Sequence, residues 1–149
     1  MVIRLTPDEI CLAAFHAVIR RRAKLAGLRA DRQQASRSTW DNEIEGASAE
    51  LAYSKQCGRY WSGLTGLKVP DCDKEEVRWT KHEGTGGLIA YPDDADTARL
   101  ILMDGFAPCY RVIGWAYARE AKQARFRQPE GYYLVPRKLL RSIEGAITA

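Results

Sequence analysis

The middle of the chain contains five short β-prone segments separated by Gly, Pro and Asp, and this pattern limits the fold more than any other sequence feature. The segments span 67–72, 75–82, 88–91, 100–103 and 110–117. Runs of this length, rich in branched and aromatic side chains, are typical of strands. A further strand is predicted at 131–135. The chain is therefore expected to build its core around a β-sheet.

Helices are predicted on both sides of this strand-rich region. Thr6-Pro7-Asp8-Glu9 combines a capping residue, a proline at the first helical position and a glutamate that completes a capping box. A helix is expected from there to about residue 27, and a second over 42–57, which Gly58 ends. The residues whose roughly helical spacing supports this helix are Ile10, Cys11, Ala14, Phe15, Val18 and Leu25. A short helix over 117–126 and a last one over 136–145 complete the expected elements.

The order of helices, strands and short helical pieces predicts an α+β (α/β) fold with a mixed sheet flanked by helices. The 149 residues suit one domain spanning 1–149. Within it we distinguish an N-terminal helical segment (1–28), a core (42–117) and a basic C-terminal segment (118–149). The polar residues 29–39 are interpreted as a loop.

Charge is unevenly distributed along the chain. Residues 1–37 carry a net charge of +5, residues 38–110 carry −6, and residues 111–141 carry +6. An acidic centre between basic arms suits a metal-dependent enzyme that acts on a polyanion, because carboxylates hold the cation while Lys and Arg hold phosphates. The alternative is that the basic helices are solvated surfaces. The residues expected to contact nucleic acid are Arg20, Arg21, Arg22, Lys122, Arg125 and Arg127.

The N-terminal sequence, the hydropathy and the cysteine spacing predict a cytoplasmic protein. No apolar run approaches the ~20 residues of a membrane span, and the first residues lead into a helix start rather than a signal peptide. The four cysteines form no CxxC pair, which favours reduced thiols. We therefore expect no membrane partner.

The residues with the clearest chemical pattern are Asp71, Glu76 and Arg78. Glu76 and Arg78 are two apart on a predicted strand, so their side chains share a face. A tight turn over 72–75 would bring Asp71 close to Glu76, and two converging carboxylates can hold Mg²⁺. The alternative interpretation is an ordinary charged hairpin, because Asp-rich turns between strands are common.

Three segments resemble the motifs of the PD-(D/E)XK nuclease superfamily. Residues 46–52 (GASAELA) are similar to its first-helix pattern, Pro70-Asp71 resembles its PD, and Glu76-Val77-Arg78 resembles its (D/E)XK. The resemblance implies a restriction-endonuclease-like core with an added N-terminal helix. It also implies that Asp71 and Glu76 bind Mg²⁺ or Mn²⁺, that Glu50 assists, and that Arg78 takes the place of lysine. A guanidinium at that position neutralises charge but does not serve as a base.

The wider chain also resembles small proteins encoded in phage and prophage genomes of actinobacteria. Matching stretches include 58–61, 70–78, 114–115, 120–122 and 134–136. This resemblance implies a phage-type accessory protein located in the host cytoplasm.

These observations support two hypotheses about function. The first is a small nuclease in which a metal-bound water hydrolyses phosphodiester bonds of DNA. The second is a non-catalytic nucleic-acid- or protein-binding module on the same fold, which Arg78 in place of lysine and the short separation of Asp71 from Glu76 favour. A host-directed inhibitor and a homodimer are further options that the sequence leaves open.

Overall fold

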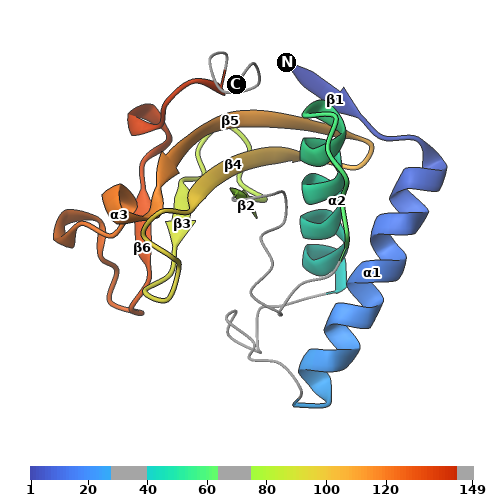
Figure 1. The fold of residues 1–149 in the computed structure, drawn as a ribbon, viewed down its shortest axis with the longest axis horizontal. Coiled ribbons are helices and arrows are strands. Elements are labelled where there is room, and N and C mark those ends of the chain that lie inside the picture. The colour runs from blue at the N-terminus through green and yellow to red at the C-terminus, as the bar shows by residue number, and fades with distance from the viewer. Residues whose placement is uncertain (28–39, 64–74, 144–149) are drawn as a thin grey trace.

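The computed structural model describes residues 1–27, 40–63 and 75–143, and these form an α+β fold with α1 (Pro7–Leu25) and α2 (Trp40–Gln56) on one side of a mixed sheet (Figure 1). The helix α3 (Ala118–Ala121) is short. The strands are β1 (Val2–Arg4), β2 (Glu75–Trp79), β3 (Leu88–Ala90), β4 (Arg99–Phe106), β5 (Cys109–Tyr117) and β6 (Tyr133–Val135). Two 3₁₀ turns, η1 (Ala124–Phe126) and η2 (Arg137–Leu139), lie near the C-terminal end.

Helix α1 begins where the sequence predicts, and most of its large apolar side chains face outward. Thr6 and Glu9 form the expected capping box. The buried apolar residues are Ala13 and Ala17, which pack with Ala47 of α2. Small side chains let the two helix backbones approach closely. The larger apolar side chains lie on the outer side, and Phe15 is 63% exposed.

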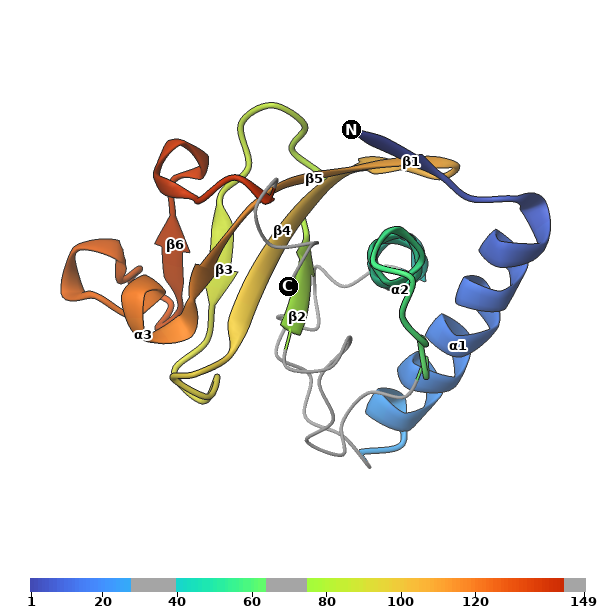
Figure 2. The ribbon, with the colours of Figure 1, turned by 45° about the horizontal axis from the view of Figure 1, so that its top comes forward.

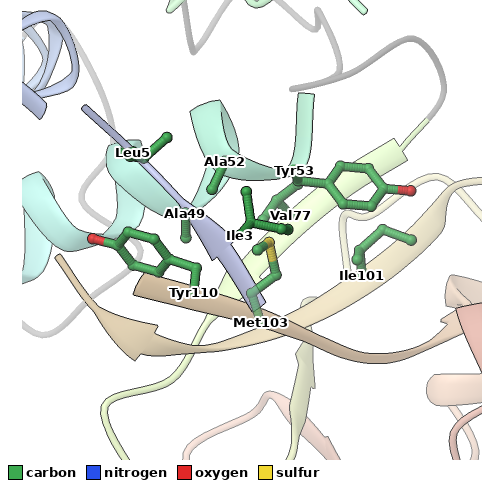
Figure 3. Close-up of a cluster of buried hydrophobic side chains, with 9 residues drawn as sticks. All are labelled: Ile3, Leu5, Ala49, Ala52, Tyr53, Val77, Ile101, Met103 and Tyr110. Carbon is green, nitrogen blue, oxygen red and sulfur yellow. The ribbon is translucent and has the colours of Figure 1, made fainter. Parts of the chain in front are cut away.

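Helix α2 lies between α1 and the sheet, as the view along its axis shows (Figure 2). Its Ala47 contacts α1, whereas Ala49, Ala52 and Tyr53 belong to the core against the sheet. Because α2 carries alanines on both faces, α1 and the sheet can both pack close to its backbone. Figure 3 shows these side chains of α2 against those of the strands.

The main sheet has the order β1-β5-β4-β2. Strands β1 and β4 are antiparallel to β5, and β2 is parallel to β4. The sheet is therefore mixed, as predicted. Strand β1 was not predicted, because three residues are too few to show an alternating pattern.

Strand β4 is the central strand and is buried on both faces. Ile101 and Met103 pack with α2, while Leu100 and Leu102 pack on the opposite side. A continuous apolar run is what a strand covered on both faces requires. The second layer comes from β3, β6, α3 and η1, which supply Leu88, Val135, Ala118 and Phe126.

Strand β5 contains an irregularity that sets which side chains face α2. Leu102 pairs with Gly114 and Met103 pairs with Val112, so Ile113 is an extra residue. An extra residue reverses the alternation of side chains. Tyr110 and Val112 pack on the α2 side before it, and Trp115 packs on that same side after it.

The C-terminal segment is joined to the core through β6, which pairs antiparallel with β3. The predicted helix over 117–126 is present only as α3 and η1. The helix predicted over 136–145 is wrong for its described part, where only η2 is helical. Arg141 instead forms a β-bridge with Trp115, and this extended pairing is incompatible with a helix.

Among the helices that the structure describes, none combines the length and apolar character needed to cross a membrane.

Candidate nucleic-acid interface

Glu50, expected to assist a metal, is held between the helices by Arg20. Nη1 and Nη2 of Arg20 donate to the two carboxylate oxygens of Glu50 at 2.9 and 2.6 Å. The Glu50 and Arg20 side chains are only 11% and 9% exposed. Both carboxylate oxygens are therefore occupied by a bidentate cation, which is the strongest common form of ion pair.

The surroundings of this pair fix it further. Trp61 Nε1 donates to Glu50 at 3.3 Å, and Arg20 Nε donates to the Gly63 carbonyl at 3.1 Å. Gly63 has a φ of +65°, and a side chain there would collide with the His16 ring, whose nearest atom would be 2.4 Å away. The loop after α2 is thereby held against α1. This geometry gives Glu50 a structural role.

Glu76 and Arg78 share a face of β2, as the sequence predicts, but that face is turned away from α2. Glu75 accepts a hydrogen bond from Tyr53 of α2, and Val77 packs in the same core, so the alternate residues point to the other side. Arg78 Nη1 contacts Glu76 at 3.2 Å. Arg78 Nη2 contacts Asp94 at 2.9 Å. The basic residue of the predicted motif thus neutralises its acidic neighbour.

Asp94 connects this pair to another predicted residue, Lys122. The Asp94 side chain is 3% exposed, and its second oxygen accepts from the Tyr91 backbone N–H at 2.8 Å. Lys122 Nζ donates to the Asp94 carbonyl at 2.7 Å and contacts Asp96 at 2.5 Å. Lys122 therefore tethers α3 to the turn after β3, a contact that leaves its ammonium engaged within the protein.

Of the predicted catalytic residues that the structure describes, Glu76 and Arg78 lie together, and Glu50 lies apart from them. Glu50 faces α1, Glu76 lies on the sheet face opposite α2, and Asp71 lies outside the described residues. Within 1–27, 40–63 and 75–143, no three His, Cys, Asp or Glu side chains are placed to hold a metal ion. Glu50 and Glu76 as the structure places them do not fit Mg²⁺ or Mn²⁺, because arginines occupy the positions that the cation would take.

The remaining residues predicted to contact nucleic acid differ in their exposure. Arg20 and Arg21 are buried, at 8% and 9% exposed. Arg22, Arg125 and Arg127 are exposed, and Arg125 lies over the Phe126 ring at 4.5 Å. A phosphate can reach these last three without any rearrangement.

A second group of basic residues surrounds two aromatic rings at the end of β5. We call Trp115, Tyr117, Arg99, Arg119 and Arg141 the arginine–aromatic cluster. The two rings meet edge to face at 5.2 Å between centroids. Arg99 and Arg141 lie over Trp115 at 4.4 and 4.8 Å, and Arg119 lies over Tyr117 at 4.8 Å. Contacts between guanidinium groups and ring faces are attractive and keep both groups at the surface.

The arginines of the cluster are anchored by two carboxylates. Glu75, only 3% exposed, binds Arg99 Nη1 at 2.6 Å, Arg59 Nη1 at 3.0 Å and the Tyr53 hydroxyl at 2.7 Å. Glu120 binds Arg141 through both oxygens at 2.6 and 2.7 Å. The hydrogen bond from Arg141 holds the pKa of Glu120 below its ordinary value of 4.5. Three arginines therefore share two carboxylates, which leaves the region positive.

Arg99 also has donors that no acceptor satisfies in the described structure. Its Nε and Nη2 are buried without a hydrogen-bond partner. An unsatisfied guanidinium N–H is costly, so such donors favour an added acceptor. Arg119 and Arg141 are exposed, and Trp115 and Tyr117 are half-buried, so an outside ligand can approach the cluster.

Only part of this cluster could be predicted from the sequence. Trp115 and Tyr117 are two apart, so a strand places them on one face. Arg99 pairs with Tyr117 in the sheet register, a relationship that only the strand pairing reveals. The bulge at Ile113, which turns both rings toward the α2 side, has no signature in the sequence. Glu75 was missed because its neighbour Glu76 fitted a known motif.

Comparisons with protein-family models, with curated proteins and with solved structures found no significant match to this chain. The nuclease and phage resemblances therefore stay predictions from short motifs.

Proposed function

We propose that this protein is a non-catalytic nucleic-acid-binding module whose binding surface is the arginine–aromatic cluster. The observation that carries the proposal is the stacking of Arg99, Arg119 and Arg141 on the adjacent rings of Trp115 and Tyr117. Proteins that bind single strands combine positive charge that follows the phosphates with aromatic faces on which bases stack. Both features are present within this one cluster.

The chemistry of binding follows from the contacts. A base would stack on the exposed part of Trp115 or Tyr117 and share the ring face with a guanidinium. Arg119 and Arg141 would turn toward phosphate oxygens, which accept bidentate hydrogen bonds. Glu120 limits this movement, because Arg141 must exchange a carboxylate for a phosphate. We therefore expect moderate affinity that decreases with salt.

The arginine–aromatic cluster is better suited to binding single-stranded nucleic acid than a duplex. The bases of a duplex are stacked on each other, and their faces are not available to Trp115 or Tyr117. A single strand presents these faces at no unpairing cost. The ligand class that we infer is therefore single-stranded DNA or RNA.

The test is a titration of fluorescently labelled single strands, followed by anisotropy at several salt concentrations. We expect the wild type to bind and Arg119→Gln to bind more weakly for every sequence, with a salt slope reduced by about 1. Tyr117→Leu should weaken binding by about 1–3 kcal/mol, the usual contribution of one stacked base.

Arg4→Gln is the matched control. Arg4 is exposed on β1, which pairs with residues 109–111 at the opposite end of β5 from the cluster. The loss of one positive charge is the same, so a general charge effect would weaken Arg4→Gln and Arg119→Gln equally. Equal effects, or no binding by the wild type, would reject the cluster as the binding surface.

The nuclease hypothesis is a competing prediction on the same fold. It depends on Asp71, outside the described residues, and on Glu76, which is paired with Arg78. Binding of single-stranded nucleic acid by the arginine–aromatic cluster does not exclude phosphodiester cleavage at another site of the chain. Cleavage must therefore be measured separately from binding.

A further inference from the structure

The outer face of α1 is apolar along most of its length. Leu12, Phe15, Val18 and Ile19 are 46–63% exposed, and Cys11 beside them is also exposed. Their positions, separated by three or four residues, place them on one side of the helix. Monomeric proteins seldom expose a continuous apolar patch of this kind without using it to bind something.

The protein does not use this face to hold α1 in place. The opposite face carries Ala13 and Ala17 against α2, together with Arg20 and its partner Glu50. Figure 2 shows α1 as the outermost element of its layer, with α2 between it and the sheet. The packing of α1 is therefore complete without the outer side chains.

We propose that this face of α1 binds the same face of a second copy of the chain, with the two helices antiparallel and crossing at Phe15. A twofold axis beside Phe15 pairs each residue with the one equally far on the other side. Phe15 then contacts Phe15 of the second copy, Leu12 contacts Val18, and Cys11 contacts Ile19. A twofold interface requires such a self-complementary surface.

The charges at the two ends of the face specify the orientation. Asp8 and Arg22 are both exposed, and each lies seven residues from Phe15, about 10 Å along the helix. Neither side chain forms an ion pair within the described structure. The antiparallel arrangement places Asp8 of one copy beside Arg22 of the other. A parallel arrangement would place like charges together at both ends.

The size of the contact indicates a weak dimer. A 19-residue helix is about 28 Å long, and one helix per copy falls at the small end of specific interfaces. We therefore expect a monomer–dimer equilibrium that depends on protein concentration. This dimer is independent of the arginine–aromatic cluster, because α2 separates α1 from the sheet.

Sedimentation equilibrium over a range of concentrations tests the dimer. The wild-type mass should rise from that of a monomer toward that of a dimer. Phe15→Glu and Val18→Glu should each remain monomeric, because a buried unpaired carboxylate is not tolerated at the interface. Both residues are exposed, so the variants should keep the wild-type circular dichroism spectrum. Leu139→Glu, at an equally exposed leucine on η2, should associate like the wild type.

A charge exchange tests the register. Asp8→Arg and Arg22→Asp should each weaken association, because each brings like charges together across the interface, and the double variant should restore it. A wild type that is monomeric at every concentration would overturn the proposal, as would a Phe15→Glu variant that still associates. Failure of the double variant to restore association would overturn the antiparallel register. Binding of a monomeric wild type to lipid vesicles would assign this face to a membrane surface instead.

Discussion

Arg20 of α1 and Glu50 of α2 form a buried bidentate ion pair that joins the two helices. Both contacts are shorter than 3 Å, and Trp61 donates a third hydrogen bond to the same carboxylate. A catalytic carboxylate would have to leave these partners before it could bind a metal. The contacts of Glu50 therefore favour a structural role for this carboxylate over a catalytic one.

The first prediction concerns the stability that this pair provides. Glu50→Ala should lower the free energy of unfolding by about 3–5 kcal/mol, because it leaves the Arg20 guanidinium buried without its partner. The double variant Arg20→Met, Glu50→Met should lose much less, because neither charge then remains. Urea unfolding of the wild type and the two variants checks this. A fully stable Glu50→Ala protein would contradict the structural role.

The second prediction concerns Asp94, which holds Arg78 on the other face of the sheet. Asp94→Ala should destabilise the protein by about 3 kcal/mol, because it removes the ion pair of Asp94 with Arg78 and the acceptor for the Tyr91 N–H. Asp93→Ala, at the exposed neighbouring position, should cost less. Thermal unfolding of the two variants measures the difference, and equal losses would contradict it.

The sequence predicted the helices and the sheet better than it predicted which sides face inward. The capping box at Thr6 and Glu9 located the start of α1, because a cap is a local interaction. The spacing of apolar residues predicted a helix but not which side of it faces inward, because Ala13 and Ala17 determine that side and small side chains contribute little to a periodic pattern. The larger side chains at Phe15 and Val18 dominated the pattern, although they face outward.

The candidate site was less predictable than the fold, because it depends on relationships between strands. Glu76 and Arg78 share a face, as the alternation requires. Glu75 and Val77 contact α2, so Glu76 and Arg78 lie on the opposite face of the sheet. No local sequence pattern reveals this contact. The arginine–aromatic cluster depends on the register that pairs Arg99 with Tyr117 and on the extra residue Ile113.

The third prediction concerns alkaline pH. Burial, and then the hydrogen bond to Glu75, raises the pKa of Tyr53 above its ordinary value of 10.0. Burial and the hydrogen bond to Glu45 do the same for Tyr110. A raised folded-state pKa means that the folded protein holds these protons more tightly than the unfolded chain. The stability linked to them is therefore complete below pH 10 and is lost as the pH rises above 10.

The measurement is the free energy of unfolding as a function of pH, together with tyrosine ionisation followed by ultraviolet absorbance. Tyr53→Phe should lose stability less steeply above pH 10 than the wild type does. Tyr60→Phe, at a tyrosine that is 87% exposed, should keep the wild-type slope. Ionisation of all seven tyrosines near pH 10 in the folded protein would contradict the prediction.

The fourth prediction concerns divalent metal ions. Glu50 and Glu76 are bound by arginines, so neither is prepared to accept Mg²⁺ or Mn²⁺. We expect the melting temperature to be unchanged by these ions and by a chelator, because only a ligand that binds the folded state stabilises it. A rise with Mg²⁺ or Mn²⁺ that is lost in Asp71→Ala would instead support the metal site that the motif resemblance implies.

The decisive measurement combines binding and strand integrity in one sample. Labelled single strands are titrated with the wild type in the presence of Mg²⁺ or Mn²⁺, and the same samples are then separated on a denaturing gel. We predict binding that Arg119→Gln weakens and strands that remain intact. Cleavage by the wild type that is lost in folded Asp71→Ala and Glu76→Ala variants would contradict a non-catalytic module and establish the nuclease. Intact strands that the wild type does not bind would contradict the nucleic-acid-binding function itself.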